Sequence, residues 1–172
     1  STDDCHYRAW QRMADEEGLP FDRERNELLR GVSRMESLAL ILEQSPREYT
    51  PAEKQELAAR KNGYYRDLIR ELTGHDLLPG ALQFMEDLRA RGLKLAVASS
   101  SKNTPAILER IGLAEYFDAV ADGNDISRSK PDPEVFLLAA ARLGIPPEEC
   151  VVVEDAEAGV QGALAAGMRV LA

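Results

Sequence analysis

The stretch LKLAVASSSKNT, residues 93–104, sets the fold class of this 172-residue chain. Its first half is apolar apart from Lys94, and its second half is a cluster of hydroxyl groups that leads into a helical pattern at Thr104. An apolar run without alternation, followed directly by a helix, is typical of a strand in a parallel sheet that helices cover on both faces. The stretch therefore predicts a strand, a polar loop and a helix in succession.

The same alternation continues on both sides of this stretch. Glycines close the helical patterns ahead of the apolar runs, at residues 92, 112, 144 and 167. The pattern predicts helices over residues 81–90, 104–111, 134–143 and 156–166, and strands over 93–98, 117–121, 151–153 and 168–171. Short helices between apolar strands indicate a doubly wound parallel sheet, so residues 76–172 are predicted to form a Rossmann-like α/β core domain.

Residues 1–75 follow a different pattern, with apolar positions at helical spacing and no strand-like run. The helical pattern is interrupted at residues 18–20, 31 and 45–46. Residues 50–53 combine an N-cap threonine, a proline at the first helical position and a glutamate three residues after the cap. These residues therefore predict a small helical bundle that is distinct from the α/β core.

The charge balance limits the partners that the chain can have. Thirty acidic residues against 21 basic ones give a net charge of −9, which opposes binding to a nucleic-acid backbone. The sequence has no apolar run long enough to cross a bilayer and no signal-peptide pattern at its start. Its two cysteines form neither a metal-ligand pair nor a disulfide framework. We therefore expect a cytoplasmic monomer that binds neither nucleic acid nor membrane.

Three polar segments follow the predicted strands, at the edge of the sheet where ligands bind in such folds. They are Ser99-Ser100-Ser101-Lys102-Asn103, Ser129-Lys130-Pro131 and Glu154-Asp155. Hydroxyl groups before a helix suit a phosphate, and a nearby lysine would neutralise its charge. Each feature alone has a simpler interpretation, because serines often cap helices and an exposed lysine is usually a solvated charge. Together the three segments make phosphate chemistry the leading hypothesis.

Glu154 and Asp155 come directly after a predicted buried strand. Packing at this position would bring like charges together and desolvate both carboxylates. A hard cation removes the conflict, and Mg²⁺ binds one or two carboxylates while keeping water and substrate phosphate as its other ligands. The alternative is that Asp155 caps the next helix and Glu154 is exposed. We predict a Mg²⁺ site at these two residues.

The helical segment contributes further candidate residues. Residues 31–34, Gly31-Val32-Ser33-Arg34, precede a helix, where the arginine could bind a phosphate bidentately and the glycine could admit a close backbone approach. His6 and Lys61 lie in helical patterns. Structural roles are the alternatives: a surface arginine in a first turn, a structural histidine and one of many charges on a long helix. The residues by themselves leave these alternatives open.

Taken together, the three polar segments resemble the second, third and fourth motifs of the haloacid dehalogenase superfamily in order and spacing. The helical segment resembles the α-helical cap domain of that superfamily, and residues 2–10, 31–34 and 60–62 are similar to its mutases that act on β-glucose phosphates. The resemblance spans nearly the whole chain. It implies that the protein interconverts β-D-glucose 1-phosphate and glucose 6-phosphate, through bound β-glucose 1,6-bisphosphate and a phospho-aspartyl enzyme.

The resemblance also implies roles for individual residues. Those implied to act in catalysis are Thr2, His6, Ser99 and Lys130. Those implied to bind the substrate are Trp10, Gly31, Val32, Ser33, Arg34, Lys61, Ser100, Ser101, Lys102 and Asn103. Glu154 would support a Mg²⁺ ion that Asp155 ligates directly. Ser99, Ser100 and Lys130 would hold the transferring phosphate, and the second phosphate would be held by Arg34, Ser101, Lys102 and Asn103. The remaining cap residues would contact the sugar or couple cap closure to its binding, with Thr2 in the hinge.

One element of the superfamily is missing from this sequence. Its members begin with a strand that ends in D-x-D-G, whose first aspartate attacks phosphorus and whose second is the general acid and base, and no D-x-D-G occurs here. In the superfamily that strand lies between those matching residues 93–98 and 151–153, so we expect a gap there with unpaired backbone groups. We also expect the last elements of the core to be absent, and this polypeptide alone to be inactive.

Two rival hypotheses fit the same residues. A sugar-phosphate phosphatase of the same fold would transfer the phosphoryl group to water, although basic residues in the cap, Arg34 and Lys61, argue against it. A non-catalytic binding module is the second rival, because the nucleophile is missing.

Overall fold

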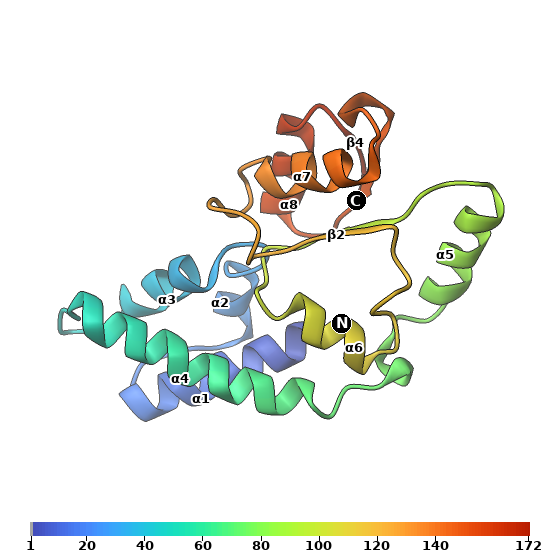
Figure 1. The fold of residues 1–172 in the computed structure, drawn as a ribbon. Helices are drawn as coiled ribbons and strands as arrows, with labels where there is room; N and C mark the ends of the chain where they lie inside the picture. Colours follow the sequence, from blue (N-terminus) through green and yellow to red (C-terminus); the bar gives the residue numbers. More distant parts are fainter. Residues whose placement is uncertain (1) are drawn as a thin grey trace.

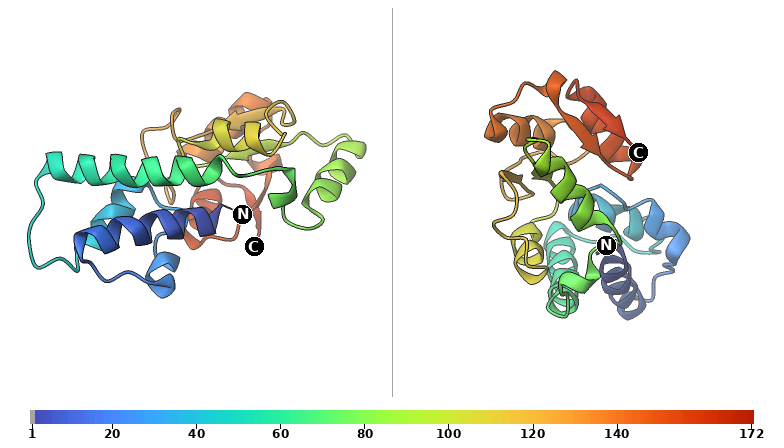
Figure 2. Two further views of the ribbon diagram at one scale, coloured as in Figure 1. Left: turned by 90° about the horizontal axis from the view of Figure 1, so that it is seen from below. Right: turned by 90° about the vertical axis from the view of Figure 1, so that its right-hand side faces the viewer.

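The structure is a computed structural model that describes residues 2–172. Its first part, which we call the helical half, contains four α-helices and a short 3₁₀ helix. Their bounds are α1 (Asp3–Glu17), α2 (Arg23–Glu27), α3 (Arg34–Leu42), α4 (Pro51–Ile69) and η1 (Gly74–Asp76). Helices α1 and α4 run antiparallel side by side along the length of this half (Figures 1 and 2).

Capping residues define where the helices of this half begin. The Thr50 hydroxyl accepts a hydrogen bond from the backbone N–H of Glu53, whose carboxylate accepts one from the backbone of Thr50, so the predicted start of α4 is confirmed. Ser33 and Glu36 form a second capping box of the same kind at the start of α3. The backbone of residues 31–34 is therefore fixed by a helix start as well as by packing.

The core of the helical half lies between α1, α3 and α4. Trp10 and Met13 on α1 pack against Leu38 on α3 and Leu57 on α4, and each of these side chains is buried. This is the burial expected for helices with one apolar face.

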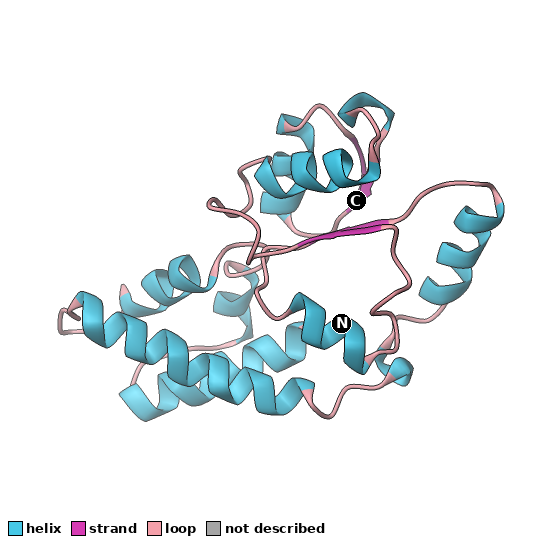
Figure 3. Ribbon diagram, viewed as in Figure 1, coloured by secondary structure: helices cyan, strands magenta, loops and turns pink. Residues whose placement is uncertain are grey.

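The second part, the α/β half, alternates helices and short strands. Its elements are α5 (Ala81–Ala90), β1 (Ala96–Ala98), α6 (Thr104–Arg110), β2 (Ala119–Ala121), α7 (Glu134–Leu143), η2 (Pro147–Glu149), β3 (Val151–Val153), α8 (Glu157–Ala165) and β4 (Arg169–Leu171). Every helix and strand predicted from residue 81 onward is present, and Figure 3 shows the strands in magenta. The strand predicted over 93–98 is shorter than expected and begins at Ala96. At Leu95 the carbonyl oxygen still accepts a hydrogen bond from the backbone N–H of Asp118, but the N–H of Leu95 donates to the Asp118 side chain instead of a backbone carbonyl.

The strands form two parallel pairs. Ala96 pairs with Ala119 in the β1–β2 pair, and Val151 pairs with Arg169 in the β3–β4 pair. Within residues 2–172, β1 and β3 are not hydrogen-bonded to each other, so the expected gap is present and the sheet is divided.

The prediction that residues 151–153 form a fully buried strand is wrong. Val151 and Val153 are 48% and 67% exposed, whereas Val152 packs against the core. Side chains alternate across a strand, so a strand that is covered on one face exposes every second residue. From the continuous apolar run we expected other elements to cover both faces of this strand. The described residues cover only the face that carries Val152.

The core of the α/β half lies around α7. Val135 and Phe136 on this helix are buried against Ala121 of β2 and Ala163 of α8. The two halves also contact each other, since Ile107 of α6 packs against a cluster in the helical half formed by Ala9, Tyr65 and Ile69. Among the described residues, no helix is both long and apolar enough to cross a bilayer.

Candidate active site

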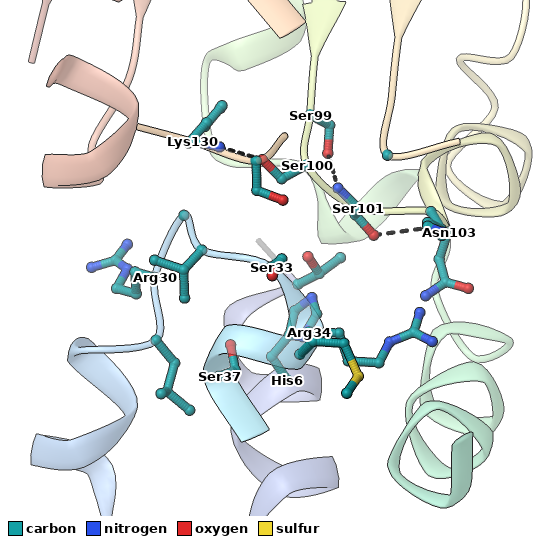
Figure 4. Close-up of a pocket in the computed structure, with 18 of the residues that line it drawn as sticks. His6, Arg30, Ser33, Arg34, Ser37, Ser99, Ser100, Ser101, Asn103 and Lys130 are labelled. Carbon is teal, nitrogen blue, oxygen red and sulfur yellow. Dashed lines mark hydrogen bonds between the residues drawn. The ribbon is translucent and has the colours of Figure 1, made fainter. Parts of the chain in front are cut away.

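A pocket of about 660 Å³ lies between the helical half and the α/β half. Every residue that the sequence analysis assigned to the site lines it: Thr2, His6, Trp10, Gly31, Val32, Ser33, Arg34, Lys61, Ser99, Ser100, Ser101, Lys102, Asn103, Lys130, Glu154 and Asp155. In Figure 4, His6, Ser33 and Arg34 face Ser99, Ser101 and Asn103 across the pocket. The tertiary structure thus gathers the candidates in one place, and their individual roles stay predictions.

The serine loop after β1 is held by its own hydroxyl groups. The N–H of Ser101 donates to the Ser99 hydroxyl at 3.1 Å, and the N–H of Asn103 donates to the Ser101 hydroxyl at 3.2 Å (Figure 4). Gly123 lies directly under the loop, where a Cβ atom would be 2.4 Å from the Ser100 carbonyl oxygen. The hydroxyl groups therefore organise the loop rather than cap α6, whose N-cap residue makes no side-chain capping bond.

Lys130 and Glu154 form a buried ion pair at the α/β side of the pocket. Lys130 Nζ lies 2.7 Å from Glu154 Oε2, and the two side chains are only 8% and 12% exposed. The other carboxylate oxygen of Glu154 accepts a hydrogen bond from the N–H of Ala156. Gly159 makes room for this arrangement, because a Cβ atom there would lie 2.2 Å from the Glu154 carboxyl carbon.

Asp155 is paired with the helical half. Its Oδ2 atom lies 2.5 Å from a terminal nitrogen of Arg30, and the side chain of Asp155 is 76% exposed. Arg30 also lies 3.2 Å from Glu27 Oε2 and 4.0 Å from Asp3 Oδ1. The pair therefore links a cluster in the helical half to the end of β3.

These pairs change the argument for a metal at Glu154 and Asp155. A hard cation was expected to relieve the repulsion between the two carboxylates, but Lys130 and Arg30 already neutralise them. Within residues 2–172, no group of three acidic, histidine or cysteine side chains could form a complete ligand cage. The oxygen-only donor set nevertheless fits Mg²⁺, which completes its shell with water and substrate oxygens. The residues present thus fit a Mg²⁺ ion with Asp155 as its direct ligand, because both oxygens of Glu154 already have protein partners.

The helical half supplies a second cationic region, formed by Lys61 and Arg34, with His6 beside Lys61. Lys61 is 2% exposed, and its Nζ atom lies 2.9 Å from Nδ1 of His6 and 4.4 Å from the centre of the Trp10 ring. No carboxylate among residues 2–172 forms an ion pair with Lys61 or Arg34. Most buried charges are paired with an opposite charge. In this region the opposite charge is missing, and an anionic ligand could supply it.

Burial governs the protonation of these groups. Desolvation, with a smaller contribution from the charge of Arg34, lowers the pKa of Lys61 to about 7. Desolvation and then the charges of Lys61 and Arg34 hold the pKa of His6 well below 6.5, so His6 is neutral and accepts a hydrogen bond from Lys61. Desolvation also lowers the pKa of Arg34 from its ordinary value. All three shifts would be reversed or reduced by a bound anion.

At Gly31 the backbone of the helical half packs closely against the α/β half. Its φ of +79° lies in the left-handed region, and a Cβ atom at this position would be 3.2 Å from the Cβ of Ala156. Close approach at Gly31 thus places Val32 and Ser33 at the pocket.

Several pocket residues were not assigned from the sequence. Arg30 pairs with Asp155, and Asn62 accepts a hydrogen bond from the side chain of Asn103 at 2.9 Å, which links the two halves. Ser37 is buried and lines the pocket one helical turn after Arg34. The spacing of Arg34 and Ser37 is the one signal that could have indicated a shared helix face.

The fold and the pocket define a class of protein. The profile of the haloacid dehalogenase-like hydrolases matches residues 1–167, and the chain belongs to this family.

Relatives within the family include both mutases and phosphatases. The chain is 45% identical to the β-phosphoglucomutase of Bacillus subtilis over 97% of its own length and 75% of the relative. It is 32% identical to the fructose-1-phosphate phosphatase of Escherichia coli, over 97% of this chain and 86% of that protein. The crystal structure of a β-phosphoglucomutase from Clostridium difficile superimposes with a TM-score of 0.93 at 38% identity, covering 99% of this chain and 77% of the other.

Proposed function

We propose that this protein acts as a phosphomutase that interconverts β-D-glucose 1-phosphate and glucose 6-phosphate, with β-glucose 1,6-bisphosphate as the bound intermediate and activator. The observation that carries the proposal is the position of cationic groups on opposite sides of one pocket. Lys61 and Arg34 lie in the helical half, whereas Lys102 and Lys130 lie in the α/β half. A sugar with a phosphate at each end fits such a pocket, because one phosphate would meet Lys130 and the other would lie between Arg34 and Lys102.

The α/β side would hold the phosphate that is transferred. The hydroxyl groups of Ser99 and Ser100 and the ammonium of Lys130 border the same part of the pocket, and the N–H of Lys130 lies 3.4 Å from the Ser100 hydroxyl. Lys130 would stabilise negative charge on the transferring group. No residue named here is proposed as the nucleophile; these groups bind and orient the phosphate.

The helical side would hold the second phosphate and the sugar. Arg34 offers a planar set of donors that matches two phosphate oxygens, and Ser101, Lys102 and Asn103 lie opposite it. Neutral His6 and Lys61 would contact the sugar hydroxyl groups. This division explains why Lys61 and Arg34, unlike Arg30 in the same half, form no ion pair with a carboxylate of residues 2–172.

Contacts between the two halves would exclude water. We propose that residues 1–75 form a cap domain that closes over the core domain, residues 76–172, with Thr2 in the hinge. The hydrogen bond between Asn62 and Asn103 crosses this boundary and does not involve the proposed Mg²⁺ ligand. Exclusion of water would favour transfer to a sugar hydroxyl over hydrolysis.

Mg²⁺ would be held at Asp155, with Glu154 supporting the site. The ion would neutralise charge on the phosphate that is transferred and orient its oxygens. The chain's own contribution is to keep both carboxylates at the rim of the pocket, with Glu154 fixed by Lys130 and by the N–H of Ala156.

A sugar-phosphate phosphatase is the second candidate function, favoured by the similarity to the Escherichia coli fructose-1-phosphate phosphatase. The products separate the two. The protein expressed from its complete reading frame is incubated with β-D-glucose 1-phosphate, a trace of β-glucose 1,6-bisphosphate and Mg²⁺, and the products are followed by ³¹P NMR. Glucose 6-phosphate supports the mutase, and inorganic phosphate without glucose 6-phosphate contradicts it.

Binding is tested separately from turnover. Trp10 is the single tryptophan and lines the pocket, so its fluorescence reports ligand binding directly. We expect β-glucose 1,6-bisphosphate to bind more tightly than either monophosphate. Equal affinity for mono- and bisphosphates would contradict the proposal that two phosphates are held at once.

A further inference from the structure

Arg30 has an unusual position in the molecule, because it contacts three carboxylates, two of which are distant from it in the chain. Glu27 is one turn before it on the same segment, Asp3 begins α1, and Asp155 follows β3 in the other half. The contact with Asp155 is the shortest of the three, at 2.5 Å against 3.2 Å and 4.0 Å. Arg30 therefore belongs to the helical half but directs its closest contact at the other half.

The same carboxylate is the proposed ligand of Mg²⁺. A Mg²⁺ ion lies about 2.1 Å from its oxygen ligands. An ion on either oxygen of Asp155 would therefore come within a few bond lengths of the Arg30 guanidinium, and the two positive charges would share one negative charge. Like charges at this distance repel, so the ion pair and the metal oppose each other.

Arg30 can leave Asp155 without losing all its partners. Glu27 and Asp3 both lie in the helical half and would stay beside the guanidinium if the halves separated. The side chain of Asp155 is 76% exposed, so water can replace the arginine there. The ion pair between Arg30 and Asp155 can therefore form and break reversibly as the two halves approach and separate.

The segment after Arg30 leads directly to the proposed phosphate-binding residues. Gly31 packs closely on Ala156, next to Asp155, and Arg34 begins α3 three residues later. A change at the Arg30–Asp155 contact would therefore be transmitted to the position of Arg34 through a short, constrained piece of backbone.

We infer that Arg30 is a positioning residue that closes the helical half over the α/β half by occupying Asp155, and that a divalent cation competes with it for this carboxylate. The inference rests on the proposed metal site at Asp155. Coupling between two sites is reciprocal. The contact of residues 28–34 with the α/β half weakens cation binding by a certain factor, and cation binding therefore weakens that contact by the same factor.

The test measures Mn²⁺ binding by electron paramagnetic resonance, which requires no turnover, on the full chain at fixed ionic strength. We expect Arg30→Gln to bind Mn²⁺ about three- to tenfold more tightly than the unmodified protein, the range expected when a partly exposed ion pair and its like-charge repulsion are removed. Arg30→Lys keeps the charge and should stay close to the unmodified protein. Arg23→Gln is the matched control, because Arg23 pairs with Asp4 in the helical half alone, and it should change the affinity less than twofold.

Asp155→Asn separates this inference from the proposed metal site. Loss of Mn²⁺ affinity in Asp155→Asn, with unchanged affinity in Arg30→Gln, would overturn the competition and leave the metal site standing. Unchanged Mn²⁺ affinity in Asp155→Asn would overturn both.

Amide hydrogen exchange gives a second readout of the same competition. Added Mg²⁺ should speed exchange over residues 28–34 in the unmodified protein, whereas in Arg30→Gln exchange there should already be fast and insensitive to Mg²⁺. Exchange that Mg²⁺ slows in the unmodified protein would show that the cation strengthens the contact, and would overturn the inference.

Discussion

The Nζ atom of Lys61 lies 2.9 Å from Nδ1 of His6, and the His6 ring packs against Tyr65 at a tilt of 31° with the ring centres 4.1 Å apart. This buried lysine has a neutral histidine as its hydrogen-bond partner, and no carboxylate of residues 2–172 forms an ion pair with it. The arrangement is unfavourable for an isolated protein and favourable for one that binds an anion.

Replacing Lys61 with methionine should stabilise the ligand-free protein. We expect Lys61→Met to raise the free energy of unfolding by about 1–3 kcal/mol at pH 7, because a buried charge is removed and a side chain of similar shape remains. Denaturation in urea measures the change. Lys54→Met on the same helix, at a residue that does not line the pocket, is the control.

The pH dependence of that difference has a definite sign. Burial lowers the pKa of Lys61 from 10.5 to about 7. Between these two values the unfolded chain binds more protons than the folded one, so the stability of the unmodified protein rises with pH across this window. The advantage of Lys61→Met should therefore shrink from pH 7 to pH 10. An advantage that stays constant would mean that Lys61 is not desolvated.

Ligand binding should take up a proton at Lys61. At pH 8 most of the unliganded protein has a neutral Lys61, and the negative charge of a bisphosphate bound in the same pocket favours the charged form. Calorimetric titration of β-glucose 1,6-bisphosphate in buffers of different ionisation enthalpy should show proton uptake that disappears in Lys61→Met. Uptake of the same size in that variant would assign the proton to another group.

Arg34→Ala should impair the bisphosphate more than a monophosphate. Loss of a charge-assisted bidentate contact should weaken binding of β-glucose 1,6-bisphosphate by about 10- to 100-fold. Hydrolysis of a single phosphate should change much less, because the α/β side can bind it alone. Arg12→Ala is the control, since Arg12 pairs with Glu16 on the surface of α1 and does not line the pocket. An equal effect on both ligands would remove the support for two phosphate-binding regions.

Glu154 and Asp155 should differ in their importance for stability although they are neighbours. Glu154→Gln leaves Lys130 buried without a carboxylate and should cost about 3 kcal/mol. Asp155→Asn removes one partner of an exposed pair and should cost less than about 1 kcal/mol. Urea denaturation of both variants tests the contrast, and similar losses would contradict the burial described for Glu154.

Gly159→Ala should displace Glu154. A Cβ atom at Gly159 would lie 2.2 Å from the Glu154 carboxyl carbon, so the carboxylate would have to leave Lys130. We expect a loss of about 2–3 kcal/mol in the free energy of unfolding. Gly63→Ala on α4 is the matched control, because a Cβ atom there meets nothing within 4 Å, and it should stabilise the helix by up to about 1 kcal/mol. Equal stability of the two variants would show that Glu154 can move freely.

Local sequence patterns determined the elements of this fold. Residues 50–53 contain their own capping groups, so α4 begins where the pattern predicted, and the glycines at 144 and 167 close their helices by local chemistry alone. The alternation of helices and apolar runs likewise fixed the α/β class. These features depend on neighbouring residues, which a sequence displays directly.

The tertiary structure alone decided how the charges of the site are paired. Nothing in the sequence indicates that Arg30 lies against Asp155, 125 residues away, or that Lys130 pairs with Glu154. The sequence named Lys61 as a candidate, but only packing beneath Trp10 and Tyr65 shows that it is buried without an anion. Pairing and desolvation depend on distances through space between elements that are remote in the chain, and periodicity records only which face each residue occupies.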